Sequence, residues 1–318
     1  MNKLQSIVSG RNEGTSGAKS FTIEASVGKV VHRGTGGRRI AQQNHIVDDP
    51  ARPRRMISLA VATRYDRVAE AGRNRPLRVV VEAEDGEEYE VFLKSSGCPE
   101  LSVTSLAHEV LAACVAGQVG LPVCRPFLVE LTPEWVASVH DAEVRQVLQA
   151  SNPIAFGSTA AGPGWKQWSS DDVLTPARRE KAVGIFVFDA WVENPDRKPS
   201  NPNLLVKGDE FRIIDHELAL LVRGLLPRPA PWQPGYLNHM MGPDSHVFAS
   251  RLRGGALDLD PIRTAWSNLS DDDLSDYEAS LPGQWAEAGD AVTAALTHIR
   301  AVRDRIDECL VEIRRTLA

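Results

Sequence analysis

Residues 194–217 read NPDRKPSNPNLLVKGDEFRIIDHE, and this stretch decides how the whole chain is interpreted. It opens as a loop that sets Asp196 and Asn201 five residues apart and holds three prolines, whose fixed φ angles stiffen the backbone. An apolar run, a tight turn and a second apolar run ending at Asp215 follow. The pattern predicts a stiff polar loop joined to a β-hairpin that has a carboxylate at its exit.

A loop Asp, a loop Asn and a strand-end Asp are residue types that phosphoryl transfer from a nucleotide needs. One Asp orients the acceptor hydroxyl, while an amide oxygen and the other Asp bind the Mg²⁺ that bridges the phosphates. Mg²⁺ is a hard cation that prefers oxygen ligands. Because Asn, Pro and Asp are also the commonest turn formers, an ordinary connecting loop is the competing interpretation.

Composition places the chain among soluble globular proteins. Its 318 residues can bury a large core, and 36 Lys and Arg against 42 Asp and Glu give a formal net charge of −6. No direct nucleic-acid binding is therefore expected. Since no apolar run is long enough for a membrane span and the N-terminus lacks an apolar signal region, we expect a cytoplasmic protein with no membrane partner. The four cysteines form no CxxC pair and are expected to be reduced thiols.

Residues 1–55 differ from the rest of the chain. They carry ten Lys and Arg against four Asp and Glu and are rich in Gly and Ser, so a basic, flexible extension is expected. Beyond them, alternating residues around Asp85-Gly86 predict a β-hairpin. The other expected elements are a helix over 104–119, a strand over 123–131, a helix over 133–150, a Gly-rich loop segment over 152–168, an apolar helix from 176 to 192, and a long helix over about 289–317.

These elements predict an α+β fold of the two-lobed protein-kinase type. A small β-rich N-lobe would span residues 56–131. A larger, mainly helical C-lobe would span residues 132–318 and carry the loop 194–203. The site is expected between the lobes.

Lys94 ends a predicted strand, and Glu109 follows fifteen residues later on a predicted helix. In kinases a strand lysine contacts the nucleotide phosphates and a helix glutamate holds it. Ser95, Ser96 and Gly97 come next and could form a phosphate-covering loop, although Ser-Ser-Gly is also a commonplace turn. Each residue alone is more often exposed, but the whole set stands in the order that a kinase requires.

Several short motifs join this set into one pattern, which resembles that of the HipA-like kinases, a bacterial branch related in fold to protein and phosphoinositide kinases. The residues that carry the resemblance are, in chain order, ATRY at 62–65, VFLK at 91–94, His108-Glu109, GLPV at 120–123, FDAW at 188–191, the loop 194–206, and Ile214-Asp215-His216.

The resemblance implies an ATP- and Mg²⁺-dependent kinase and a role for each matched residue. Asp196 would be the catalytic Asp, with Arg197 ordering the loop or neutralising phosphate. Lys94, supported by Glu109, would bind phosphate. The implied metal ligands are Asn201 and Asp215, with Asn203 as a second candidate. Glu217 stands where relatives have Gly, so it would either add a carboxylate near the metal or point to solvent.

The expected reaction is transfer of the ATP γ-phosphoryl group to a Ser or Thr hydroxyl of a protein, including the chain itself. A small-molecule or phosphoinositide-type acceptor is the alternative within the enzyme class. A catalytically silent nucleotide-binding pseudokinase or partner-binding module is the alternative outside it. An antitoxin-like or regulatory partner is a further expectation.

Overall fold

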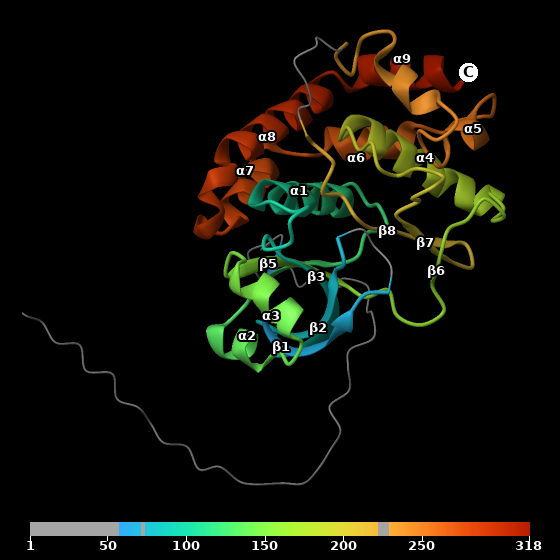
Figure 1. Ribbon diagram of the computed structural model, residues 1–318. Helices are drawn as coiled ribbons and strands as arrows, with labels where there is room; N and C mark the ends of the chain where they lie inside the picture. The colour runs from blue at the N-terminus through green and yellow to red at the C-terminus, as the bar shows by residue number, and fades with distance from the viewer. Residues whose placement is uncertain (1–56, 71–73, 222–228) are drawn as a thin grey trace, which may run out of the picture. The chain divides into compact units, whose positions relative to one another are not determined.

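The computed structural model describes residues 57–70, 74–221 and 229–318 of the chain. The extension predicted for residues 1–55 lies outside these residues. The described part combines strands and helices, which confirms the α+β class (Figure 1). Its division into two lobes stays a prediction.

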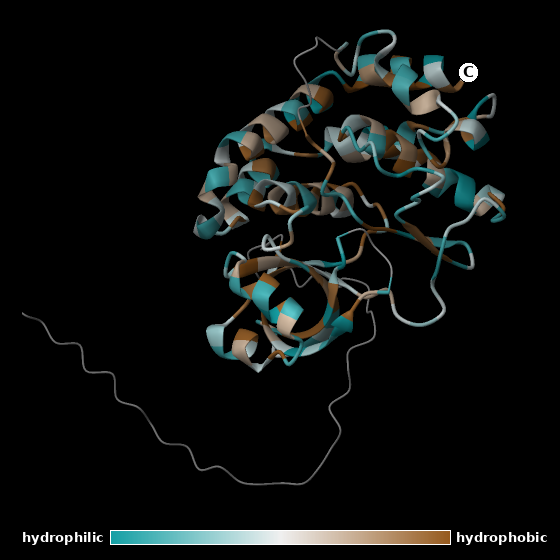
Figure 2. Ribbon diagram, viewed as in Figure 1, coloured by the Kyte–Doolittle hydropathy of each residue, from teal (hydrophilic) through white to brown (hydrophobic). Residues whose placement is uncertain are grey.

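The first strands form a closed barrel in the order β1-β2-β3-β5-β4. Strands β1 and β4 pair in parallel, and the other neighbours are antiparallel. Alternate side chains of the strands point inward, and hydrophobic stretches of these strands appear brown in Figure 2. The strand bounds are Ser58–Val68 for β1, Leu77–Ala83 for β2, Glu88–Lys94 for β3, Pro126–Glu130 for β4 and Ile154–Thr159 for β5.

Helix α1, Val103–Gln118, follows β3 and is buried along most of its length. It starts at a capping box, in which the Ser102 hydroxyl accepts from the Ser105 backbone N–H and the Ser105 hydroxyl accepts from the Ser102 N–H. Such reciprocal caps satisfy donors that a helix start leaves open. The helix packs on β4 and β5 on one side and on α8 and the 3₁₀ helix η2 on the other. It therefore connects the barrel with the helical part.

The hairpin predicted from residues 203–215 is present. Strands β7, Leu204–Lys207, and β8, Glu210–Ile213, pair antiparallel, and the short β6, Lys166–Gln167, adds a third strand. The Ile213 N–H donates to the Pro122 carbonyl (2.8 Å). This bond ties the end of the hairpin to the segment that leads into β4.

Helices make up most of the remaining described chain. Helix α4 begins at a Thr175 cap with proline in its first turn, as predicted, and its apolar residues lie in the main core. The bounds are α2 Pro133–Ser138, α3 Ala142–Gln149, α4 Pro176–Trp191, η1 Tyr236–Met241, α5 Ala249–Leu252, α6 Asp260–Ser267, α7 Asp271–Ser280, η2 Gly283–Ala288, α8 Gly289–Asp304 and α9 Ile306–Leu317. Among these helices, none is both long and apolar enough to cross a lipid bilayer.

Three sequence predictions of elements were wrong. The helix expected over 133–150 is two helices, because residues 139–141 leave helical geometry and Asp141 caps a new start. The helix expected over 289–317 is broken at Arg305, which has φ −121°. The loop expected over 152–168 contains strand β5. The barrel therefore continues past residue 131, where the sequence placed the end of the strand-rich part.

Gly97, in the turn between β3 and α1, lies directly against helix α3. A Cβ added at Gly97 would stand 2.0 Å from the Val147 carbonyl oxygen, which is backbone and cannot rotate away. We predict that Gly97→Ala lowers the free energy of unfolding by about 1–3 kcal/mol, the usual range for overpacking. Urea unfolding followed by circular dichroism measures this change.

Gly283→Ala is the matched control, because a Cβ there meets nothing within 4 Å. Its unfolding midpoint should stay at the wild-type value or rise slightly. Equal midpoints for Gly97→Ala and the wild type would show that α3 does not press on this turn.

Candidate active site

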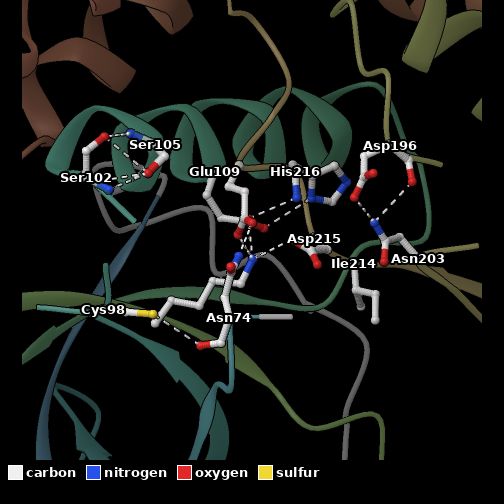
Figure 3. A network of polar contacts seen from close by, with 12 residues as sticks. Asn74, Cys98, Ser102, Ser105, Glu109, Asp196, Asn203, Ile214, Asp215 and His216 are labelled. Atoms are coloured by element: carbon white, nitrogen blue, oxygen red, sulfur yellow. Dashed lines mark hydrogen bonds and ion pairs between the residues drawn. The ribbon is translucent and has the colours of Figure 1, made fainter. Parts of the chain in front are cut away.

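The Lys94 ammonium group is the centre of the site. Its Nζ lies 2.8 Å from Glu109 Oε2, 2.6 Å from Asp215 Oδ1 and 2.6 Å from Glu217 Oε2. Strand β3, helix α1 and the segment after β8 thus meet at one cation, as Figure 3 shows around Glu109 and Asp215. The lysine, the helix glutamate and the strand-end aspartate predicted from the sequence are brought together.

The cluster holds three carboxylates for one ammonium group. Burial works to lower the pKa of Lys94, but the charges of Glu109, Asp215 and Glu217 outweigh it and hold the pKa above its usual value. Burial alone would raise the pKa of Glu109, yet Lys94 and His216 hold it below its usual range. For Glu217, burial raises the pKa to about 7, with Lys94 opposing and Asp215 and Glu109 adding to the rise. Carboxylates thus outnumber cations in this cluster, and the excess of negative charge adds to the rise in the pKa of Glu217.

Glu109 does more than hold the lysine. Its Oε2 accepts from the His216 backbone N–H (2.9 Å), and its Oε1 lies 3.4 Å from His216 Nδ1. With 3% of its side chain exposed, Glu109 is almost fully buried. The α1 carboxylate therefore fixes the backbone directly after Asp215, whose own φ of 64° is unusual for a residue other than glycine.

Glu217 is buried and faces Lys94, so the alternative of a solvent-facing side chain is excluded. Its second oxygen accepts from Asn74 Nδ2. Asn74 stands just before β2 and gave no signal in the sequence, because its partner is 143 positions away. Together these two residues join the start of β2 to the segment after β8.

The loop carboxylate Asp196 is held by both asparagines. Its Oδ2 accepts from Asn201 Nδ2 (2.8 Å) and from Asn203 Nδ2 (3.1 Å; Figure 3 shows the Asn203 contact). Since a carboxylate only accepts hydrogen bonds, each amide turns its nitrogen to Asp196 and its oxygen elsewhere. Both amide oxygens are therefore oriented away from Asp196 and could serve a cation.

Arg197 lies beneath the loop and is fully buried. It pairs with Asp189 of α4, with Nε 2.5 Å from Oδ2, and it donates to the backbone carbonyls of Asn203 and Ile214. Of the two roles considered for Arg197, this geometry favours ordering of the loop, since no part of the guanidinium is free to meet a phosphate.

Asp189 also accepts from Asn194 Nδ2 (2.8 Å) and lies 3.1 Å from His246 Nε2. Burial would raise the pKa of Asp189, but Arg197 and His246 hold it below its usual range. Burial lowers the pKa of His246 more than Asp189 raises it. Helix α4, the loop and the segment before α5 are thus fastened at one carboxylate.

The turn after Lys94 is fastened to α3. The Ser96 hydroxyl accepts from the Asn152 backbone N–H (2.9 Å) and lies 3.4 Å from the Ser151 hydroxyl. Gly97 lies against Val147, and Ser95 is buried. These contacts favour the turn interpretation for the three residues; their binding of a cofactor stays a prediction.

Oxygen atoms of Glu109, Asp215 and Glu217 lie within 4.8 Å of one another, so the donor set is of the kind that hard divalent cations prefer. The backbone joins this group to the loop, because the Ile214 N–H donates to the Asn203 carbonyl (3.1 Å). Among the contacts of the described residues, none joins Asp215 directly to Asn201 or Asn203. Their sharing of one cation stays a prediction.

A family model described as HipA-like kinase matches residues 65–225, just over half of the chain. The chain belongs to the HipA-like kinase family. Membership in this family of kinases indicates a phosphotransferase, and the match spans most of the barrel, α1, α4 and the loop that carries Asp196. The resemblance inferred from the sequence is confirmed.

Two other comparisons complete the picture. Among solved structures, the HipA-like chain is similar to a Helicobacter pylori proinflammatory kinase, CtkA, with a TM-score of 0.34 and 12% sequence identity over 75% of this chain and 96% of that one. Comparison with curated proteins finds no match.

We predict that Asp189→Asn lowers the free energy of unfolding by about 3–5 kcal/mol, because it leaves the buried Arg197 charge without its partner. Urea denaturation near neutral pH measures the loss. The matched control is Asp307→Asn, which breaks the exposed pair with Arg263 and should leave the midpoint unchanged. A wild-type midpoint for Asp189→Asn would show that the Arg197 pair does not stabilise the fold.

The same carboxylate predicts a pH dependence. The pKa of Asp189 is lower in the folded than in the unfolded chain, so the unfolded chain binds more protons and stability falls as pH drops below about 5. The lowered pKa of His246 acts in the same direction below about pH 6.5. Wild-type stability should therefore fall more steeply with acid than that of Asp189→Asn. Parallel pH profiles would contradict this assignment.

Proposed function

We propose that the chain transfers the γ-phosphoryl group of ATP, with Mg²⁺, to a Ser or Thr hydroxyl of a protein. The observation that carries the proposal is the meeting of Lys94 with Glu109 and Asp215, from three segments far apart in the sequence. Structural ion pairs also occur in protein cores. Here, however, the cluster stands beside the loop that holds Asp196, in a family of kinases.

The residues fit a nucleotide with its metal ion. Asp215, with an amide oxygen from Asn201 or Asn203, would hold Mg²⁺, and Lys94 would hold phosphate oxygens while Glu109 keeps the ammonium group in place. Bound Mg²⁺ would supply charge neutralisation on the phosphates. Glu217 offers a further carboxylate on the same side, and its surplus negative charge favours a cation there.

Asp196 is suited to receive the acceptor hydroxyl. Two amides hold its Oδ2, whereas its Oδ1 has no partner among the described contacts. The fixed carboxylate would therefore present Oδ1 to the hydroxyl and take up its proton as the hydroxyl oxygen bonds to the γ-phosphorus. The bond from that phosphorus to the β,γ-bridging oxygen would break, with ADP as the leaving group. Arg197 would support this placement through its hydrogen bonds to backbone carbonyls of the loop region. Rigid placement matters because phosphoryl transfer depends mainly on positioning and charge stabilisation.

Entry of a nucleotide requires movement. The space between Phe156 of β5, Ile214 and Asp215 holds a cavity of only about 10 Å³, whereas ligand pockets usually offer several hundred. The bonds from Lys94 to Asp215 and Glu217 hold strand β3 to the segment after β8, whose Asp215 lines this cavity. Nucleotide phosphates that take over Lys94 would release both carboxylates and let the segments separate.

We predict that Asp196→Asn and Asp215→Asn each lower the rate of phosphoryl transfer by about 10²–10⁴-fold, because each removes a group that acts on the reacting oxygens or their cation. Labelled ATP with Mg²⁺, followed by mass spectrometry of the products, measures the rate. Asp171→Asn, at an exposed position, is the control and should keep wild-type turnover. Full turnover in either active-site variant would overturn the assignment.

Lys94→Ala should chiefly raise the KM for ATP, because the phosphates lose their cation. The same change leaves Glu109 buried without its partner, so folding must be checked by circular dichroism. Lys94→Arg keeps the positive charge, but a planar guanidinium does not reproduce the ammonium contacts. Its KM for ATP should therefore lie between those of the wild type and Lys94→Ala. An unchanged KM in a folded Lys94→Ala variant would remove Lys94 from nucleotide binding.

A further inference from the structure

A pocket of about 330 Å³ opens beside the residue that precedes Asp196. It is separate from the small cavity at Asp215, with which it shares no lining residue. The side chains used below come from the segment after α4, the segment after β8, and η1 with the residues before it. They are Glu193, Pro195, Leu221, Pro229, Tyr236 and His239.

Glu193 stands where a glycine would be expected. It follows Val192, which caps the C-terminus of α4, and has a φ of 53°. The Asn194 N–H donates to the Asp189 carbonyl (2.8 Å), which is the bond that closes a helix end through a left-handed residue. Glycine adopts this conformation without strain, whereas other residues adopt it at a cost of about 1–2 kcal/mol. A glutamate held here points to a need for its side chain.

The wall opposite Glu193 is rigid. The buried carboxylate of Glu312, in α9, accepts from the backbone N–H groups of Gly235 (2.9 Å) and Leu237 (3.2 Å). Arg315 lies on the same carboxylate and compensates its charge. The start of η1, and with it Tyr236, is thus fixed to α9. The Tyr236 side of the pocket is therefore held by contacts within the protein.

Among the described residues, the Glu193 carboxylate has no cationic partner. Its Oε1 lies 3.1 Å from the Tyr236 hydroxyl, and no Lys, Arg or His of the described chain pairs with it. His239 Nδ1 lies 2.8 Å from the Tyr236 carbonyl. Because a carbonyl only accepts, Nδ1 carries a proton and donates it to this bond. The side-chain oxygen of Asn238, which also lines the pocket, accepts a hydrogen bond from Arg315.

The other walls are apolar. Leu221, Pro195 and Pro229 contribute carbon surface, and the Tyr236 ring adds an aromatic face. A ligand that suits such a pocket has a hydrocarbon stem and a cationic, donor-rich head. Arginine and lysine side chains have this form, and the guanidinium matches a carboxylate best.

We propose that this pocket binds a basic side chain of the protein acceptor, with Glu193 as its anion, and so selects hydroxyls that lie near an arginine. The inference rests on the proposed function, because it assigns the acceptor of the same site. Since Pro195 lines the pocket and Asp196 is the next residue, the arginine and the hydroxyl would stand a few residues apart, at about 3.3–3.6 Å per extended residue.

A peptide series tests the proposal on the full-length protein. Each peptide holds one serine and one arginine, the arginine is moved one position at a time, and norleucine replaces it in the reference. We expect at least one register in which arginine raises kcat/KM by about tenfold, equal to about 1.4 kcal/mol. Glu193→Gln should bring the ratio of arginine to norleucine peptide close to one, and Glu193→Lys should favour a peptide with glutamate at that position.

Glu193→Gly guards against a folding artefact, because glycine suits the left-handed backbone and should keep or raise the unfolding midpoint. It should lose the arginine preference as Glu193→Gln does. Glu134→Gln, at an exposed position in α2, should keep the wild-type ratio. Absence of an arginine preference in the wild type, or its persistence in Glu193→Gln and Glu193→Gly, would overturn the pocket assignment.

The outcomes also separate this inference from the proposed function. Phosphorylated peptides without any arginine preference leave the kinase in place and refute the pocket. Absence of phosphoryl transfer to every peptide and to the chain itself refutes both. A preference for free cationic amines over every peptide also refutes the assignment to a protein acceptor. Mapping of the modified residues shows whether a preferred hydroxyl belongs to this chain or to the added peptide.

Discussion

A single buried ammonium group organises the site of this HipA-like kinase. Lys94 neutralises carboxylates from α1 and from the segment after β8, and without it three acidic side chains would face each other in a place with little water. Like charges at such distances repel strongly where the local dielectric constant is low. The hairpin β7–β8 therefore reaches the barrel through an ionic contact, assisted by the bond of Ile213 to Pro122. These polar contacts act together with the apolar core, in which Ile213 belongs to the same buried cluster as Leu128 and Phe156 of the barrel.

The Asp189–Arg197 pair and the Lys94 cluster differ in charge balance and in exposure to solvent. The Asp189–Arg197 pair is balanced, fully buried and bonded on every side, which is the arrangement expected of a structural brace. The Lys94 cluster has a surplus of negative charge, and the Asp215 side chain remains partly exposed. Imbalance beside an accessible carboxylate is typical of a place that binds a ligand. The family match spans both groups.

The sequence predicted the parts of the site whose signal is local. Lys94 at a strand end, Glu109 on the next helix, and Asp196 with its two asparagines could be recognised because spacing and order carry the information. Asn74 and the contact of His216 with Glu109 could not, because the partners lie more than a hundred positions away. Strand β5 was missed because Gly157 weakens its strand pattern. In the fold that glycine is needed, since a Cβ would stand 2.8 Å from Val129 Cγ2. The sequence left two orientations open for the Glu217 side chain, toward the metal or toward solvent. Its burial in the structure decides between them.

The Asp189–Arg197 pair also links the Asp196 loop to residues 244–247. His246 lies against the carboxylate that holds Arg197, and the Val247 N–H donates to the Arg197 carbonyl (2.9 Å). A further link joins the Ser200 hydroxyl to Asp244 (2.8 Å). Residues 244–247 therefore contact the Asp196 loop directly at Arg197 and Ser200, and indirectly through Asp189 of α4. Movement of the segment before α5 is therefore coupled to movement of the loop. A displacement of that segment would change the position of the Asp196 carboxylate, which would meet the acceptor.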